Sequence, residues 1–142
     1  MQDEYLMKMV SRSFEDVDKP HVIEITSVAE FTGNADNYRI AFTEDEGERK
    51  GSKTTLTVLD GSCITIVRDG SYVSEMTIEK NIRHLSQIAT PFGSFSIGAS
   101  AQYIESRMTE NGGSLLFRYQ TDVELRPASD IEIELTIEKI TD

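Results

Sequence analysis

Near its carboxyl end the sequence reads Ile131-Glu132-Ile133-Glu134-Leu135-Thr136-Ile137-Glu138. Aliphatic residues occupy every second position, and acids or threonine occupy the positions between them. Successive side chains of a β-strand point to opposite faces, so this period of two is typical of a half-buried strand. The sequence therefore predicts a strand with one apolar face toward a core and one acidic face toward solvent.

Similar short segments fill the chain from His21 to about Ile140, and turn residues separate them. Asp60-Gly61 and Asp69-Gly70 each follow an alternating run, and Asp-Gly is a strong hairpin signal because a type I′ turn needs positive φ at both central residues. Pro91 ends a weaker strand, since proline cannot donate a hydrogen bond to a neighbouring strand. We therefore predict an all-β fold, a single antiparallel meander of about eight to nine strands closed into a barrel, because closure removes exposed edges.

Residues 1–19 differ from the rest of the chain. Their apolar side chains are spaced for one short helical stripe, and the residue before Pro20 is pushed out of the helical region. We expect an arm or short helix over residues 1–19 and one barrel domain over residues 20–142. With 142 residues, 38% of them hydrophobic, the chain can bury a core without disulfides or a structural metal. The residues of the expected stripe are Tyr5, Leu6, Met9 and Val10.

The global composition disfavours several classes of partner. A formal net charge of −11 repels phosphate backbones, so no nucleic-acid binding is expected. No apolar run approaches the roughly 18 residues that a membrane helix needs, and Asp3 and Glu4 stand where a secretory signal would carry lysines. Cys63 is the single cysteine and cannot form an intramolecular disulfide. These features together predict a cytoplasmic protein with no membrane association.

Four stretches, in this order and spacing, resemble the YwiB-like family of uncharacterised bacterial proteins. The most specific parts are Arg-x-Gly, at Arg68 and Gly70, and Thr-Pro-x-Gly, at Thr90, Pro91 and Gly93. The resemblance covers the chain from Pro20 to Ile140 and implies a calycin-like, lipocalin-like β-barrel. It implies no activity, because the family has no assigned function. The four stretches are Ile40-Ala41-Phe42-Thr43-Glu44, Thr54-Thr55-Leu56, Val67-Arg68-Asp69-Gly70 and Ala89-Thr90-Pro91-Phe92-Gly93.

The sequence contains no catalytic motif. His21 and His84 lie far apart and have no partner at the spacing of a zinc site. The serines around Gly93 do not follow the G-x-S-x-G spacing of a nucleophile elbow. We therefore predict a protein that is not an enzyme and that uses no metal or cofactor.

Four polar side chains are candidates for a ligand site. Arg68 continues the apolar face of its strand, and Glu44 does the same one hairpin earlier. If these faces line the lumen, both charges point inward, where charges are paired or contact a ligand. The alternative is that both are solvated at the rim. Tyr103 and Tyr119 are in the inward register and would either supply hydroxyls to the same cavity or belong to the core.

Two hypotheses for the function follow. In the first, the barrel binds a small, partly apolar, acidic ligand, and Arg68 holds the acidic group. In the second, the barrel has a packed core and is a non-enzymatic interaction module that binds a protein or a second copy of itself. The size and lining of the barrel interior distinguish the two.

Overall fold

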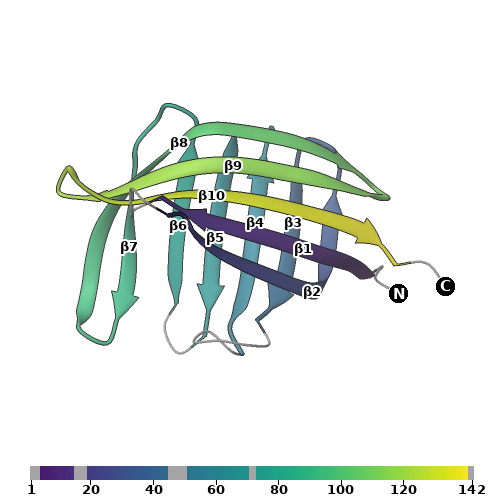
Figure 1. The fold of residues 1–142 in the computed structure, drawn as a ribbon, viewed down its shortest axis with the longest axis horizontal. Coiled ribbons are helices and arrows are strands. Elements are labelled where there is room, and N and C mark those ends of the chain that lie inside the picture. Colours follow the sequence, from purple (N-terminus) through teal and green to yellow (C-terminus); the bar gives the residue numbers. More distant parts are fainter. Residues whose placement is uncertain (1–3, 15–18, 45–50, 71–72, 141–142) are drawn as a thin grey trace.

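A computed structural model describes residues 4–14, 19–44, 51–70 and 73–140, except for the side chain of Thr90. Ten antiparallel strands form one closed barrel, in which each strand pairs with its sequence neighbours and β1 pairs with β10 (Figure 1). The predicted all-β meander barrel is confirmed, with ten strands instead of eight or nine. The strands are β1 Glu4–Ser13, β2 His21–Gly33, β3 Tyr38–Thr43, β4 Lys53–Leu59, β5 Cys63–Asp69, β6 Ser74–Glu79, β7 His84–Thr90, β8 Gly93–Thr109, β9 Gly112–Val123 and β10 Arg126–Lys139.

The predicted amino-terminal helix is wrong. Residues Glu4–Ser13 form β1, which pairs with β2 along one edge and with β10 along the other. Tyr5, Met7 and Met9 are buried in the barrel, so the buried apolar residues of this segment recur with a period of two, as in a strand. Leu6 supported the helical reading, yet its side chain is exposed on the outer face. The described residues contain no helix, and so none that is long and apolar enough to cross a membrane.

Among the described residues, buried side chains from every strand except β7 pack together in the barrel interior. At the end that holds the β2–β3 turn, three aromatic rings close the interior. The ring of Phe31 lies 5.3 Å from that of Tyr5 and 5.5 Å from that of Tyr38. The hydroxyls of the two tyrosines are hydrogen-bonded. Tyr5 donates to the carbonyl of Glu110 (2.7 Å), and Tyr38 pairs with Ser106 Oγ (2.6 Å). Burial raises the pKa of Tyr38.

The opposite end of the barrel, here called the mouth, is where the β1–β2, β3–β4, β5–β6, β7–β8 and β9–β10 hairpins turn. The start of β1 and the end of β10 lie away from it (Figure 1). The β2–β3 pairing covers only Ala29–Gly33, and the β6–β7 pairing among the described residues is the single pair Ser74–Ile88. The β2–β3 wall is therefore paired only toward the aromatic end, whereas the described β6–β7 pair lies near the mouth.

Candidate functional site

One row of inward-facing positions crosses the wall of the barrel near the mouth. Cross-strand pairing places Phe42 beside Thr54, Thr54 beside Arg68, Arg68 beside Ser74 and Ser74 beside Ile88. Polar side chains occupy the centre of this row. The next inward row on β3 to β6, toward the aromatic end, is apolar and consists of Ile40, Leu56, Ile66 and Met76. On β4, β5 and β6 the inward-facing residues thus change from aliphatic to polar at the same row, which forms a polar site on the inner wall of the barrel.

Thr54 is the most deeply buried polar residue of the row. Its side chain is 3% exposed, and its Oγ1 has no hydrogen-bond partner among the described residues. A buried hydroxyl left in this state costs about 1–3 kcal/mol, so native proteins rarely retain one without a reason. The Nε of Arg68, on the neighbouring strand, is also buried. A hydroxyl and a guanidinium are therefore held side by side on the inner surface.

Glu44 follows Phe42 in the inward register and is 8% exposed. Its backbone closes the start of the β3–β4 connection, because its N–H donates to Ser52 O (2.9 Å) and its carbonyl accepts from Gly51 N (2.8 Å). The expectation that Glu44 and Arg68 share the inner face agrees with this placement. A direct ion pair between them stays a prediction.

The apolar part of the site comes from the β7–β8 hairpin. Ile88 pairs with Phe95, and both are in the register that faces inward. Phe95 is nevertheless 46% exposed, and Ile88 and Ile97 are only partly buried. An apolar surface thus adjoins the polar row and is not covered by the described part of the chain.

The structure does not place Tyr103 at this site. A β-bulge inserts Gln102 between Ala101, which pairs with Tyr119, and Tyr103, which pairs with Arg118. One extra residue reverses the alternation, so Tyr103 lies on the outer face. Tyr119 is buried in the core, where its ring stacks on Phe117 with centroids 6.0 Å apart. The predicted inward register is therefore wrong for Tyr103 and right for Tyr119.

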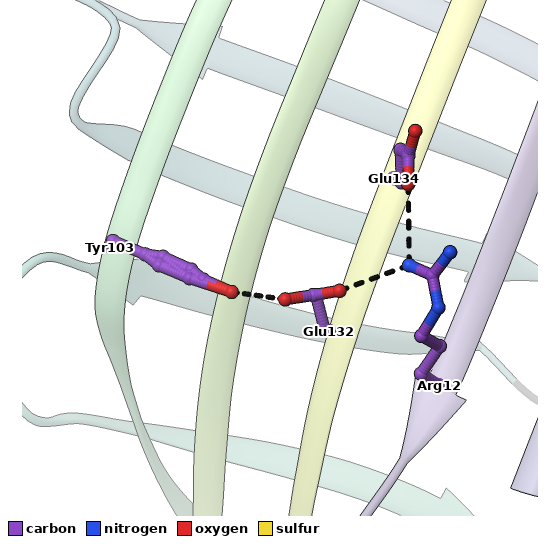
Figure 2. A network of polar contacts seen from close by, with 4 residues as sticks. All are labelled: Arg12, Tyr103, Glu132 and Glu134. Carbon is purple, nitrogen blue, oxygen red and sulfur yellow. Dashed lines mark hydrogen bonds and ion pairs between the residues drawn. The ribbon is translucent and has the colours of Figure 1, made fainter. Parts of the chain in front are cut away.

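On the outer face Tyr103 joins a polar network (Figure 2). Its hydroxyl donates to Glu132 Oε2, while Arg12 Nη1 lies 3.0 Å from Glu132 Oε1 and 3.3 Å from Glu134 Oε2. Every group in the network is paired, and the network links β8, β10 and β1. We therefore read it as a structural clamp on the outside of the barrel.

Two other clusters lack the features of a site. A groove of about 290 Å³ lies on the outer face of β2–β4, but its charges are mixed: Glu30 lines it together with Arg39 and Lys53. Cys63 pairs with Glu79, whose carboxylate binds His84 Nε2 at 3.0 Å. Burial, followed by the charge of Glu79, raises the pKa of the Cys63 thiol, which is the opposite of what a nucleophile needs. No group of three or more potential metal ligands occurs among the described residues.

Comparison with known proteins places the fold in a family. Residues 7–135 match the family model described as "Domain of unknown function (DUF1934)". The chain belongs to this family. Its fold is similar to the crystal structure of the ywiB protein from Bacillus subtilis, with a TM-score of 0.82 and 18% identity over 99% of this chain and 94% of that one. No curated protein matches the chain. The predicted YwiB-like resemblance is confirmed, and with it the fold but no activity.

The family-motif positions flank the mouth. Gly70 packs so closely on the side chain of Ser52 that a β-carbon would collide with it, which accounts for the glycine of Arg-x-Gly. Pro91 stands in the turn between β7 and β8, and Gly93 starts β8 with φ of 118°. The backbone at Thr90 pairs with that of Gly93. Both motifs therefore lie on hairpins that surround the polar row.

Sequence reasoning singled out Arg68 and Glu44 as inward-facing polar residues but did not single out Thr54 or Ser74. Both lie in phase with apolar residues, as Thr54 precedes Leu56 and Ser74 precedes Met76 at a spacing of two. A polar residue at an inward position is the signal that identified Arg68, and it applies equally to these two.

Proposed function

We propose that the mouth binds a small ligand with an acidic group and an apolar part. The buried Oγ1 of Thr54 carries this proposal, because it is a hydrogen-bonding atom aimed into the barrel and has no partner among the described residues. An oxyanion placed there would accept from Thr54 and from the adjacent guanidinium of Arg68. The apolar remainder would lie on Ile88 and Phe95.

Glu44 sets a condition on this ligand. Its carboxylate is nearly buried on the same inner surface, so an acidic ligand competes with it for Arg68. A guanidinium has five N–H donors and can serve two carboxylates at once. We therefore expect one acidic group in the ligand and not several.

Fluorescence titration with anilinonaphthalene sulfonate, an acidic aromatic dye, tests the proposal. Losing one charge-assisted hydrogen bond should raise the dissociation constant of Arg68→Gln by at least about tenfold. Arg107→Gln removes an exposed arginine on the outside of β8 and should leave the dissociation constant of the dye unchanged. Equal dissociation constants for the two variants would refute the site.

Thr54→Val gives an independent test. Valine fills the same volume without a hydroxyl, so the free energy of unfolding should rise by about 1–3 kcal/mol while dye binding weakens. Thr57→Val is the control, because it changes the same strand on its outer side. It should neither raise the free energy of unfolding nor weaken dye binding. Increased stability with unchanged dye binding would show that the hydroxyl has no role in a ligand site.

A second candidate function is self-association, which the β9–β10 turn favours. Glu124 and Leu125 both have positive φ (52° and 69°), and Leu125 is 75% exposed at the tip. Positive φ is costly for a bulky residue, and such strain is often kept for function. Sedimentation equilibrium should show a dimer that Leu125→Gly weakens. A monomer for both proteins excludes a dimer through this turn.

We also propose that the protein acts in the cytoplasm without catalysing a reaction. The lone cysteine supports the location, and the raised pKa of its thiol argues against a thiol nucleophile. Incubation with generic ester and phosphoester substrates should give no turnover above that of Arg68→Gln.

A further inference from the structure

The outer face of β10, β1 and β2 carries a stripe of aliphatic side chains. These three strands lie side by side on one side of the barrel (Figure 1). Leu6 on β1 pairs with Val28 on β2, and the two side chains are 47% and 51% exposed. Val10 continues the stripe along β1 and is half-buried, and the exposed Val22 ends it on β2. These side chains, here called the β1–β2 stripe, place neighbouring apolar groups at the surface.

Strand formation alone does not require aliphatic residues at these positions. On β4, β5 and β6, several outward-facing positions hold threonine, which is β-branched and favours strands as valine does. These threonines are Thr55, Thr57, Thr65 and Thr77. Where aliphatic residues are instead exposed together and polar residues surround them, the patch is typical of an interaction surface.

Acidic side chains border the β1–β2 stripe on both sides. On the β10 side, pairing puts Glu138 beside Leu6 and Glu134 beside Val10. On the β2 side it puts Glu24 beside Val10. Glu24 and Glu138 are exposed and make no ion pair with any described residue. Among the described residues of the three strands, Lys8 and Arg12 are the outward-facing cations, and the outward-facing acids are Glu4, Glu24, Glu30, Asp130, Glu132, Glu134 and Glu138.

Two of these acids oppose each other directly. Glu4 and Glu30 are cross-strand partners at one end of the face, and both are exposed. Like charges at directly opposite positions destabilise a sheet, and solubility would be served equally well by acids placed apart. On the outer face of β3 to β6 the charges of the described strand residues are more nearly balanced, being Arg39, Lys53, Asp69, Glu75 and Glu79. Negative charge is thus concentrated where the aliphatic stripe is exposed.

We propose that the outer face of β10, β1 and β2 docks a basic amphipathic helix of a partner protein. The apolar side of the helix covers the β1–β2 stripe, and its lysines or arginines reach the acids on either side. Charge selects this occupant, because the same acids repel nucleic acid, an anionic membrane surface and a second copy of this acidic face. The face lies outside the barrel, so the inference does not depend on the ligand proposed for the mouth.

The dimensions of the face fit a single helix. From Leu6 to Arg12 the strand advances by about 20 Å, because each residue adds about 3.3 Å. About 13 helical residues span that length, since each adds about 1.5 Å. Three strands spaced by about 4.8 Å are about 10 Å wide, which is close to the diameter of a helix with its side chains. A helix aligned with β1 therefore covers the stripe and stays within reach of both acidic borders.

A synthetic peptide of about 14 residues, long enough to span the face, serves as the probe. Leucine occupies one helical side of the peptide and lysine the other positions, and a control peptide has glutamate in place of every lysine. Fluorescence anisotropy of the labelled peptides gives the dissociation constants. The natural protein should bind the lysine peptide at least about tenfold more tightly than the glutamate peptide. Equal affinity for the two peptides would overturn the proposal.

Glu24→Lys and Glu75→Lys distinguish this face from a general attraction to an acidic protein. Each replaces an exposed glutamate on the outside of the barrel, and both change the net charge equally. Glu24→Lys should raise the dissociation constant of the lysine peptide by at least about fivefold, because it reverses a charge beside the stripe. Glu75→Lys lies on β6 and should change it by less than about twofold. Equal increases would mean that the peptide responds only to net charge, which overturns the docking face.

Leu6→Ser combined with Val28→Ser tests the apolar part. The double variant should raise the dissociation constant of the lysine peptide by at least about tenfold, because two aliphatic contacts are lost. The control is Leu59→Ser combined with Leu85→Ser, which removes two exposed leucines from β4 and β7. This control should bind within about twofold of the natural protein, and equal weakening in both double variants would overturn the stripe as the contact.

Sedimentation equilibrium tests the competing occupant with the same proteins. The natural protein should show no dimer that depends on this face. A dimer that the Leu6→Ser, Val28→Ser variant loses and the Leu59→Ser, Leu85→Ser control keeps would assign the face to a second copy of the chain, and would overturn the proposed helix.

Discussion

The hydroxyl of Tyr103 on β8 donates a hydrogen bond to Glu132 on β10, so one side chain spans the intervening strand β9. The bulge at Gln102 makes this possible, because without the extra residue the ring would point into the core. Arg12 on β1 completes the contact from the other side of Glu132. The bulge therefore converts a residue of the predicted lumen into a cross-link on the outer surface.

Tyr103→Phe tests this cross-link. Removing the hydroxyl should lower the free energy of unfolding by about 1 kcal/mol, a value at the lower end for a bond to a carboxylate because the site is partly exposed. Burial, followed by the bond to Glu132, raises the pKa of Tyr103 from 10.0 to about 12. Chemical denaturation of both proteins across the alkaline range measures the effect.

The sign of the pH dependence follows from that shift. The folded state holds the Tyr103 proton more tightly than the unfolded state, so this stabilisation is complete below the unfolded pKa of 10.0 and is lost as the pH rises toward about 12. The stability of the natural protein should fall more steeply over this range than that of Tyr103→Phe. Parallel curves would show that the hydroxyl bond does not contribute.

Met7→Ala tests whether β1 is part of the core. Met7 is fully buried between β2 and β10, so the truncation should cost about 2–5 kcal/mol. Lys8→Ala changes the next residue, on the outer face, and should cost less than about 0.5 kcal/mol. Similar small losses for both, measured in urea, would mean that the first strand is a dispensable arm.

Much of the fold could be predicted from alternation and turns. The turn at Asp60-Gly61 has positive φ at both residues (54° and 66°), as predicted, and β7 ends at the residue before Pro91. The hairpin predicted at Asp69-Gly70 involves residues 71–72, which lie outside the described residues. The first strand was missed because a ten-residue segment with apolar residues at both spacings fits a helix and a strand equally well.

The site was harder to predict because register and closure are properties of the whole barrel. No local signal marks the bulge at Gln102, which moves Tyr103 to the outer face. The exposure of Phe95 depends on where β9 stops pairing with β8, at Gly98, and this follows from the lengths of other strands. The inward orientation of Arg68 and Glu44 could be predicted because it depends only on alternation within one strand.

The β9–β10 turn gives a prediction about stored strain. Replacing Glu124-Leu125 with Asp-Gly should raise the free energy of unfolding by about 1–2 kcal/mol, because the strain at Leu125 disappears. Gly61→Leu is the reverse test. A β-carbon at Gly61 would meet nothing within 4 Å, so its cost is conformational and should be of similar size and opposite sign. Thermal denaturation measures the stability of both variants. If neither substitution changed it, a leucine at positive φ would carry no measurable cost in these turns.

The last prediction concerns the two charges of the mouth. If Arg68 and Glu44 are coupled on the inner surface, Arg68→Met leaves a nearly buried carboxylate without its cation and should cost about 3–5 kcal/mol. Adding Glu44→Leu should then recover much of the loss, because an apolar pair of similar volume suits this environment.

Two solvated charges predict a different result for the same proteins. Each single substitution should then change stability by less than about 1 kcal/mol, and the double variant should show their sum. Denaturation of the three variants and the natural protein decides between the two, since the coupling is the departure from additivity. Strong coupling would mean that Arg68 has a resident partner in Glu44. An acidic ligand must then displace or share that partner, and dye affinity should rise in Glu44→Leu alone.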